Sequence, residues 1–140
     1  MRRRAFMTFL GGAALSPLPL RAQQVEKLPT IGFLGSNTPA AQSQWINAFA
    51  GRLRELGWID GRTVKIEYRW TDGRSERAAG IAAEFVRLKV DVIVTSGTPN
   101  VVGAKQAASV IPIVFAAAAD PVGTGLVASL ARPGGNATGL

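Results

Sequence analysis

From residue 30 onward, short apolar runs alternate with longer segments in which apolar residues recur at helical spacing. Four of the short runs predict strands: Thr30 to Leu34, Thr63 to Trp70, Val90 to Thr95 and Ile111 to Ala116. Residues Ala137 to Leu140 are expected to open a fifth strand. Strands that alternate with helices are typical of a parallel sheet. The pattern therefore predicts an α/β fold with four to five parallel strands and helices on both faces.

Four segments between these runs predict helices: near Pro39 to Gly57, about Ser75 to Leu88, about Pro99 to Ser109 and about Pro121 to Ala131. In the first helix the large apolar residues share one face. That spacing predicts one buried stripe, made of Trp45, Ile46, Phe49, Leu53 and Leu56. The second helix is expected to turn three residues into the core: Ile81, Phe85 and Leu88.

The pattern within each strand predicts its place in the sheet. The run over 63–70 alternates cleanly, with Val64, Ile66, Tyr68 and Trp70 on one face and Lys65, Glu67 and Arg69 on the other. Such alternation indicates one face open to water, which favours an edge strand. The runs over 90–95 and 111–116 are almost continuously apolar, so we expect central strands covered on both faces.

The first 22 residues have the three-part layout of an export signal. Arg2, Arg3 and Arg4 form a basic start, an interrupted apolar stretch runs from Ala5 to Leu20, and polar residues follow from Gln23. The segment Arg3-Arg4-Ala5-Phe6-Met7 resembles the twin-arginine consensus, although Thr8 departs from it. We therefore expect export by the twin-arginine translocase, cleavage near Gln23 and a soluble periplasmic product. An uncleaved membrane anchor is the alternative.

Composition narrows the classes of function. The chain has 140 residues and a formal net charge of +7, with 16 basic residues and 9 acidic ones. Four of the basic residues fall in the first 22 positions, and the others form no basic stripe, so nucleic acid is not expected as a partner. The absence of cysteine and histidine excludes disulfides, a lipoprotein anchor, thiolate catalysis, Cys/His metal sites and a Ser-His-Asp triad. No cofactor is expected.

Three predicted helices begin with a capping residue followed by proline: Thr38-Pro39, Thr98-Pro99 and Asp120-Pro121. Each pair is explained equally well as an ordinary helix start. In a parallel sheet, however, these starts share the carboxyl edge, where open α/β folds bind ligands. Helix N-termini favour anions there, and nearby polar side chains come from Ser36, Asn37, Thr38, Ser96 and Thr98. Asp120 is expected either to cap its helix or to pair with a ligand ammonium group.

Other ligand classes receive no support from the motifs. Gly32-Phe33-Leu34-Gly35 lacks the third glycine of a dinucleotide-binding fingerprint, and the chain has no Walker A motif. Tyr68 and Trp70 share one strand face, which favours core packing over stacking on an aromatic ligand.

Several segments, in order, carry a family resemblance: Ile31-Gly32-Phe33-Leu34-Gly35, Leu53-Arg54-Glu55-Leu56-Gly57, Ile66-Glu67-Tyr68-Arg69-Trp70, Gly97-Thr98-Pro99, Asp120-Pro121-Val122-Gly123 and Ala131-Arg132-Pro133-Gly134-Gly135-Asn136. They resemble the bacterial ABC transporter substrate-binding proteins that include the tryptophan- and tyrosine-binding lipoproteins. The resemblance covers residues 30 to 140.

The resemblance implies the N-terminal lobe of a type I periplasmic binding protein, with strand order 2-1-3-4-5. It divides the chain into a signal (1–22), a lead-in (23–29) and a lobe (30–140), without the second lobe that relatives possess. A fragment or a truncated gene product is therefore expected. By position, the cleft would be faced by Ser36 to Thr38, by Ser96, Gly97 and Thr98, and by Ala117 to Asp120.

The function implied is periplasmic solute binding for an ABC importer. Its partners would be a small amino-acid-like or carboxylate-bearing ligand and an inner-membrane ABC permease. A periplasmic sensor domain of the same fold is the alternative. An enzyme on a similar sheet is a third hypothesis, disfavoured because the chain has no histidine, cysteine or nucleotide motif.

Overall fold

The computed structural model describes residues 27–129 and 134–139. The predicted twin-arginine signal lies outside the described residues, as do most of the lead-in, Ala131 and Leu140. None of the helices within these two ranges is long and apolar enough to cross a membrane.

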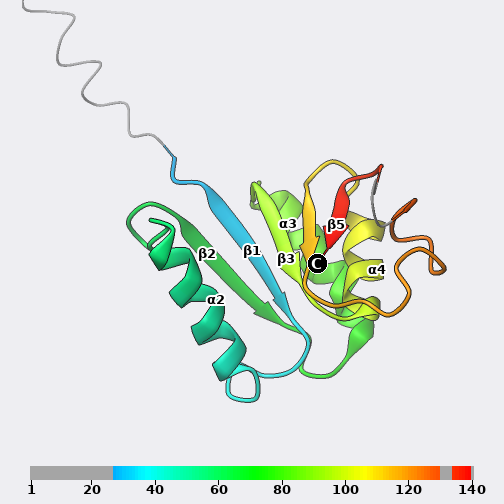
Figure 1. The fold of residues 1–140 in the computed structure, drawn as a ribbon, viewed down its shortest axis with the longest axis horizontal. Coiled ribbons are helices and arrows are strands. Elements are labelled where there is room, and N and C mark those ends of the chain that lie inside the picture. Colours follow the sequence, from blue (N-terminus) through cyan, green and yellow to red (C-terminus); the bar gives the residue numbers. More distant parts are fainter. Residues whose placement is uncertain (1–26, 130–133, 140) are drawn as a thin grey trace, which may run out of the picture.

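Five parallel strands form one sheet, in the order β2-β1-β3-β4-β5. The strands are β1 (Thr30–Gly35), β2 (Lys65–Trp70), β3 (Val92–Thr95), β4 (Ile113–Phe115) and β5 (Ala137–Gly139). The predicted α/β class, the edge position of β2 and the strand order are confirmed. All five carboxyl ends therefore point to the same edge of the sheet (Figure 1).

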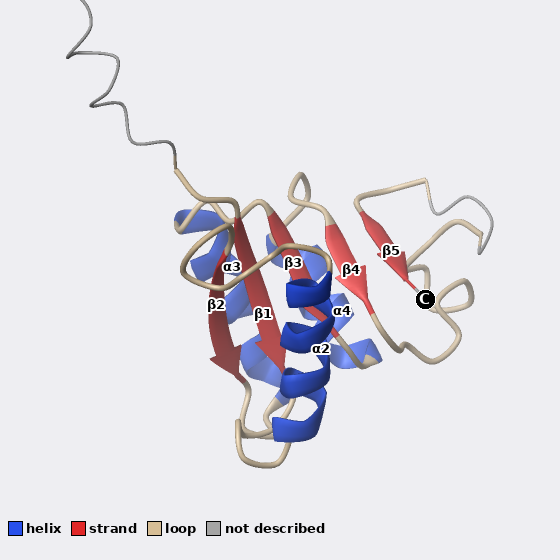
Figure 2. Ribbon diagram, turned by 60° about the vertical axis from the view of Figure 1, so that its left-hand side comes forward, coloured by secondary structure: helices blue, strands red, loops and turns tan. Residues whose placement is uncertain are grey.

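Helices lie on both faces of this sheet. They are α2 (Ser43–Glu55), α3 (Ala78–Arg87), which follows the short 3-10 helix η1 (Ser75–Arg77), and α4 (Thr98–Ala107). Figure 2 shows α2 in front of the sheet and α3 and α4 behind it. The sheet is thus covered by two helices on one face and by one helix on the other.

The core is concentrated on the face covered by α3 and α4. Phe85 of α3 is fully buried and packs with Leu34, Ile93 and Ile113 from three strands. Its ring lies so close to β1 that a Cβ on Gly32 would stand 2.7 Å from a ring carbon. The prediction that Phe85 turns inward is confirmed, whereas Leu88, at the end of α3, is 41% exposed, contrary to expectation.

The α2 face is covered only in part, and the predicted buried stripe is wrong. Trp45 is 64% exposed and Leu56 is 58% exposed, and no residue of α2 is buried. A helix is about 10 Å wide and strands are about 4.8 Å apart, so one helix covers about two strands of the five. For the same reason Val94 and Val114 are only half-buried, although β3 and β4 were expected to be covered on both faces.

Beneath α2, aromatic rings hold the helix against β1 and β2. Phe33 lies with its ring centroid 5.4 Å from those of Phe49 and Tyr68, and 5.8 Å from that of Trp70. Tyr68 and Trp70 are parallel to one another, with 6.4 Å between centroids. These two strand residues therefore contribute to packing, as their spacing predicts.

The alternation in β2 suggested that its polar face is open to water. The structure instead shows this face forming ion pairs. Arg69 Nε lies 3.0 Å from Glu84 Oε1 on α3, and Arg69 also contacts Glu67. Lys65 Nζ lies 2.7 Å from Glu67 Oε1. Alternation in the sequence cannot distinguish a solvated face from one that pairs with charges on a neighbouring helix.

Over residues 121–129, the described part of the fourth predicted helix, no helix forms. Asp120 Oδ1 accepts a hydrogen bond from the Gly123 N–H at 2.9 Å, so a first turn does begin. Gly125 then adopts φ +74°, outside the helical region, and residues 126–128 continue as bends. Glycine favours such conformations and weakens a helix, which explains why the turn does not continue.

Two helix glycines offer a matched test of the packing between α3 and α4. A Cβ on Gly103 of α4 would lie 2.7 Å from Ala78 Cβ and 2.9 Å from the Ala79 backbone nitrogen, whereas a Cβ on Gly80 of α3 meets nothing within 4 Å. We expect Gly103→Ala to lower the free energy of unfolding by about 1–3 kcal/mol. Gly80→Ala should raise it by roughly 0.5–1 kcal/mol. Urea unfolding followed by circular dichroism measures both, and shifts of the same sign would contradict this packing.

Glu67 gives a prediction for acid stability. The hydrogen bond from Lys65, opposed by burial and aided by nearby positive charge, holds the pKa of Glu67 below its ordinary value of 4.5. Its stabilising contribution is therefore complete above pH 4.5 and is lost as the pH falls through the lowered pKa. We expect Glu67→Gln to flatten the loss of stability below pH 4.5, measured by unfolding at several pH values. Glu76→Gln, an exposed carboxylate without an ion pair among the described residues, is the control and should leave the slope unchanged.

Candidate functional site

The strand order places a crevice at one position of the carboxyl edge. β1 lies between β2 and β3. After β1 the chain first adds β2 on one side of it, and then returns to add β3, β4 and β5 on the other side. The loops that follow β1 and β3 therefore diverge above the sheet. In open α/β folds this switch point is where ligands bind.

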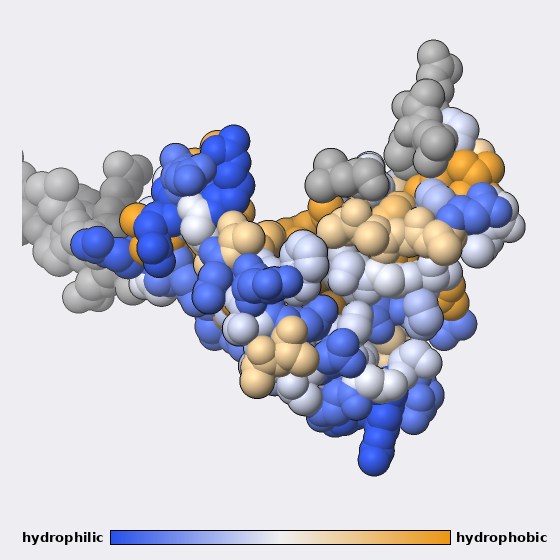
Figure 3. Space-filling view, turned by 60° about the horizontal axis from the view of Figure 1, so that its bottom comes forward, coloured by the Kyte–Doolittle hydropathy of each residue, from blue (hydrophilic) through white to orange (hydrophobic). Residues whose placement is uncertain are grey.

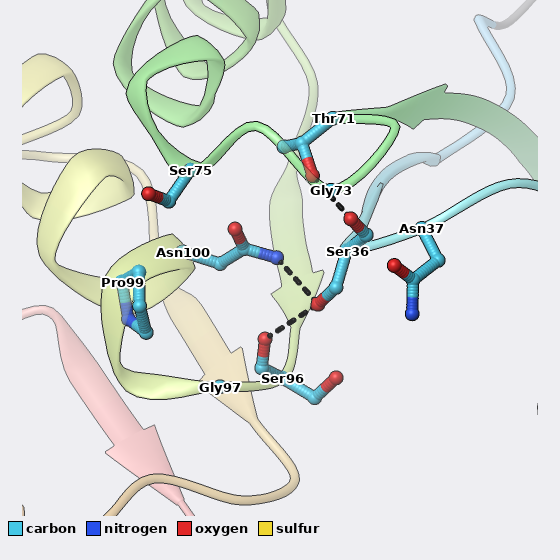
Figure 4. Close-up of a pocket in the computed structure, with 9 residues that line it drawn as sticks. All are labelled: Ser36, Asn37, Thr71, Gly73, Ser75, Ser96, Gly97, Pro99 and Asn100. Carbon is cyan, nitrogen blue, oxygen red and sulfur yellow. Dashed lines mark hydrogen bonds between the residues drawn. The ribbon is translucent and has the colours of Figure 1, made fainter.

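A pocket of about 290 Å³ lies at this switch point (Figure 4). Its lining comes from the loops after β1, β2 and β3 and from the start of α4: Ser36, Asn37, Thr71, Gly73, Ser75, Ser96, Gly97, Pro99 and Asn100. The lining contains hydroxyls, amides and backbone groups but no charged side chain. Within residues 27–129 and 134–139, no three acidic side chains gather in a way that could hold a metal ion.

The predicted site residues divide into three groups. Ser36, Asn37, Ser96 and Gly97 line the pocket together. Thr98 and Ala117 line an adjoining hollow that shares Gly97 with it. Thr38 and Asp120 line none of the hollows described here and act as local caps. Thr38 Oγ1 accepts a hydrogen bond from the Ala41 N–H at 3.2 Å, and Asp120 caps the turn described above.

The predicted N-cap roles of Thr38 and Thr98 are corrected by the structure. The helix after Thr38 begins only at Ser43, and Thr98 is the first residue of α4 rather than its cap. Thr98 Oγ1 instead accepts a hydrogen bond from the Ala119 N–H at 2.8 Å. Its hydroxyl therefore fastens the loop after β4 to the start of α4.

The N-terminus of α4 carries no side-chain cap from the part of the chain that is described. Pro99 has no N–H, and the first hydrogen bond of this end of the helix runs from the Val101 N–H to Gly97 O at 3.1 Å. The backbone N–H groups of Thr98 and Asn100 thus have no acceptor within the helix. They add to the positive end of the helix dipole beside the pocket.

Other side chains fix the loops around the pocket. Gln42 Oε1 accepts hydrogen bonds from the backbone N–H groups of Ser36, at 3.0 Å, and Asn37, at 3.4 Å. The Thr71 hydroxyl and the Gly73 N–H both donate to Ser36 O, which ties the loop after β2 to the loop after β1. The pocket is therefore held by contacts between loops that are distant in sequence.

Sequence reasoning missed the loop after β2 and the residue inside α4. Thr71, Gly73 and Ser75 follow a strand at the same carboxyl edge as the others, so the parallel topology was a usable signal. Asn100 gave no signal in the sequence, because an asparagine within a helical segment ordinarily faces solvent. It is 3% exposed.

A second hollow, of about 360 Å³, adjoins the polar pocket at Ser96 on the α2 face. Its lining is mainly apolar and includes Phe33, Trp45, Phe49 and Val94. Figure 3 turns the carboxyl edge toward the viewer and shows hydrophobic surface at the base of a notch, beside a more hydrophilic part of the surface on the left. Polar and apolar hollows thus lie side by side at one edge of the sheet.

Comparison with known proteins identifies relatives of this architecture. The chain is 38% identical over 91 residues to a tyrosine-binding protein of Clostridioides difficile (strain R20291), which covers 65% of this chain and 26% of the relative. Two solved structures match with a TM-score of 0.73 and 30% identity. One is a ligand-free, open substrate-binding protein with adhesive properties from Clostridium difficile, and the other is an ABC domain from Streptococcus pneumoniae in complex with L-Trp.

These two structures are matched over 80% and 81% of this chain, and over 38% of their own length. The chain therefore spans about a quarter of the curated relative and somewhat more than a third of the solved ones. A family model described as ABC transporter substrate binding protein matches residues 39–140, most of the chain and all of the strands after β1. The chain thus belongs to the ABC transporter substrate-binding protein family.

Proposed function

We propose that this chain forms one wall of the solute cleft of an ABC importer, and that the polar pocket at the β1/β3 switch point binds a small amino-acid-like or carboxylate-bearing solute. The observation that carries this proposal is the uncapped N-terminus of α4, which opens onto the pocket beside Ser36 and Ser96. Backbone N–H groups and the helix dipole favour an anionic group there without a charged side chain.

The neighbouring apolar hollow supports a solute that has both a polar and an apolar part. Trp45, Phe49 and Phe33 offer aromatic surface next to the polar pocket, and the two hollows meet at Ser96. A ligand with a carboxylate and an apolar side chain could occupy both. The names of two relatives, a tyrosine-binding protein and an ABC domain bound to L-Trp, agree with this class of solute.

We further propose a transport role outside the cytoplasm. The twin-arginine segment at 1–22 would export the chain to the periplasm, where it would hand its solute to an inner-membrane ABC permease. Relatives are longer, and a second lobe would close the cleft by a hinge motion. The pocket lining includes no carboxylate, and the chain has no histidine or cysteine, so we propose binding without catalysis.

A thermal-shift screen of L-amino acids and simple carboxylates tests the proposal. A solute that binds the folded chain at about 100 times its Kd stabilises it by about 2.7 kcal/mol, which should raise the Tm by roughly 10 °C. We expect such a rise with at least one amino-acid-like solute, and no turnover of that solute by mass spectrometry. No shift across the panel would contradict the assignment, and a consumed solute would favour an enzyme.

A matched pair at Thr98 tests whether the β3 and β4 loops shape the site. Thr98→Val keeps the shape of the side chain but removes the acceptor for the Ala119 N–H, whereas Thr98→Ser keeps the hydroxyl. One net hydrogen bond corresponds to about 0.5–1.5 kcal/mol, so we expect affinity to fall by roughly 2- to 12-fold in Thr98→Val and to be retained in Thr98→Ser. Equal affinities in both variants would mean that this contact does not serve binding.

A further inference from the structure

One side chain in the pocket is almost fully buried and yet has an unused hydrogen-bonding atom. Asn100 is 3% exposed, and its Nδ2 donates to Ser36 Oγ at 3.0 Å. No hydrogen bond from a described residue reaches its Oδ1. Every fully enclosed side-chain polar atom in the described part has a partner, so this oxygen opens onto the pocket. Figure 4 shows it turned away from Ser36, toward the side where Thr71 and Ser75 lie.

The Ser36 hydroxyl fixes which end of the amide faces the pocket. A serine hydroxyl has one proton to donate, and Ser36 directs it to Ser96 O at 3.4 Å. Its oxygen is then free to accept from Asn100 Nδ2. With the amide reversed, Asn100 Oδ1 and Ser96 O would compete for the same proton. The carbonyl oxygen of Asn100 therefore faces the space that a ligand would fill.

The pocket consequently presents two opposite polarities from the first turn of one helix. The backbone N–H groups of Thr98 and Asn100 are donors, and they suit a carboxylate. Asn100 Oδ1 is an acceptor, which a carboxylate cannot satisfy. A buried acceptor left unpaired by a bound ligand is costly, so a ligand that lacks an N–H or O–H donor at this point is disfavoured.

We propose that Asn100 is the specificity-determining residue of this pocket, and that its Oδ1 accepts a hydrogen bond from the α-ammonium group of an amino acid whose carboxylate lies at the α4 N-terminus. The inference rests on the proposed function, because it names the part of the solute that the same pocket selects. It predicts selection for a zwitterionic head group over a simple carboxylate of the same size and shape. Ser36 acts as a positioning residue, since it orients the amide without contacting the ammonium group.

NMR titration of the full chain with pairs of probes tests this selection. The pairs are L-tryptophan with indole-3-propionate, and L-tyrosine with 3-(4-hydroxyphenyl)propionate, in which the second member lacks only the ammonium group. A hydrogen bond to a charged group predicts that the amino acid binds about 10- to 100-fold more tightly. In Asn100→Ala the ratio of the two affinities, amino acid over des-amino analogue, should fall toward one. In Asn100→Asp, which keeps an acceptor in the same place, the ratio should be kept or increased.

Variants of the neighbours separate orientation from general damage. Ser36→Ala should lower the ratio because the amide loses the partner that orients it, and Ser36→Thr should restore the ratio because the hydroxyl returns. Asn47→Ala removes an exposed asparagine of α2 that lines neither the polar pocket nor the apolar hollow, and it is the matched control, with an unchanged ratio. Circular dichroism verifies that each variant is folded.

The outcomes distinguish the two levels of the proposal. If both members of a pair bind the unaltered chain equally, or if Asn100→Ala weakens both by the same factor, the role of Asn100 is wrong while solute binding stands. If neither the amino acids nor their des-amino analogues shift any resonance, the proposed function fails and the inference fails with it.

Discussion

β1 lies between β2 and β3, and the two connections that leave and return across it run on opposite faces of the sheet. The crossover through α2 carries the chain to the β2 edge on one face, and the crossover through α3 brings it back past β1 to β3 on the other. The loops after β1 and β3 lead to helices in different layers, and they touch only near Ser36 and Ser96, where the two chains leave the sheet side by side. The pocket and the α4 N-terminus both follow from this topological constraint.

Close contacts on the α3 and α4 face make that arrangement rigid. Phe85 sits over β1 because Gly32 has no side chain, and α4 approaches α3 because Gly103 has none. Tight contact of this kind fixes the helices relative to the sheet, so the start of α4 reaches the carboxyl edge at a defined position. The prediction that Phe85 faces inward was confirmed because helical period and hydrophobicity determine it, whereas β3 and β4 are buried on one face only. The prediction of a buried stripe on α2 was wrong because a single helix covers only part of a five-stranded sheet.

In the proposed role, selection in this pocket would depend on hydrogen-bond direction rather than on charge. No charged side chain lines it, so the donors of the α4 N-terminus and the acceptor of Asn100 determine which polar groups fit. The hydrogen bond from the Ala119 N–H to Thr98 Oγ1 holds the loop after β4 to the start of α4, and those from the Ser36 and Asn37 N–H groups to Gln42 hold the loop after β1. A pocket built this way would distinguish solutes that differ by one hydrogen-bond donor, because an unpaired buried acceptor is costly.

The sequence by itself determined the strands, the parallel α/β class and the polar carboxyl edge that contains Ser36 and Ser96, because these depend on local period and composition. It did not determine that the segment after Pro121 stops after one turn, since glycine adopts negative and positive φ about equally readily and Gly125 takes φ +74°. Nor could it place Thr71 beside Ser36, or turn Asn100 inward with its oxygen toward the pocket. Only the tertiary structure decided these, because each depends on hydrogen bonds and packing between segments far apart in the chain.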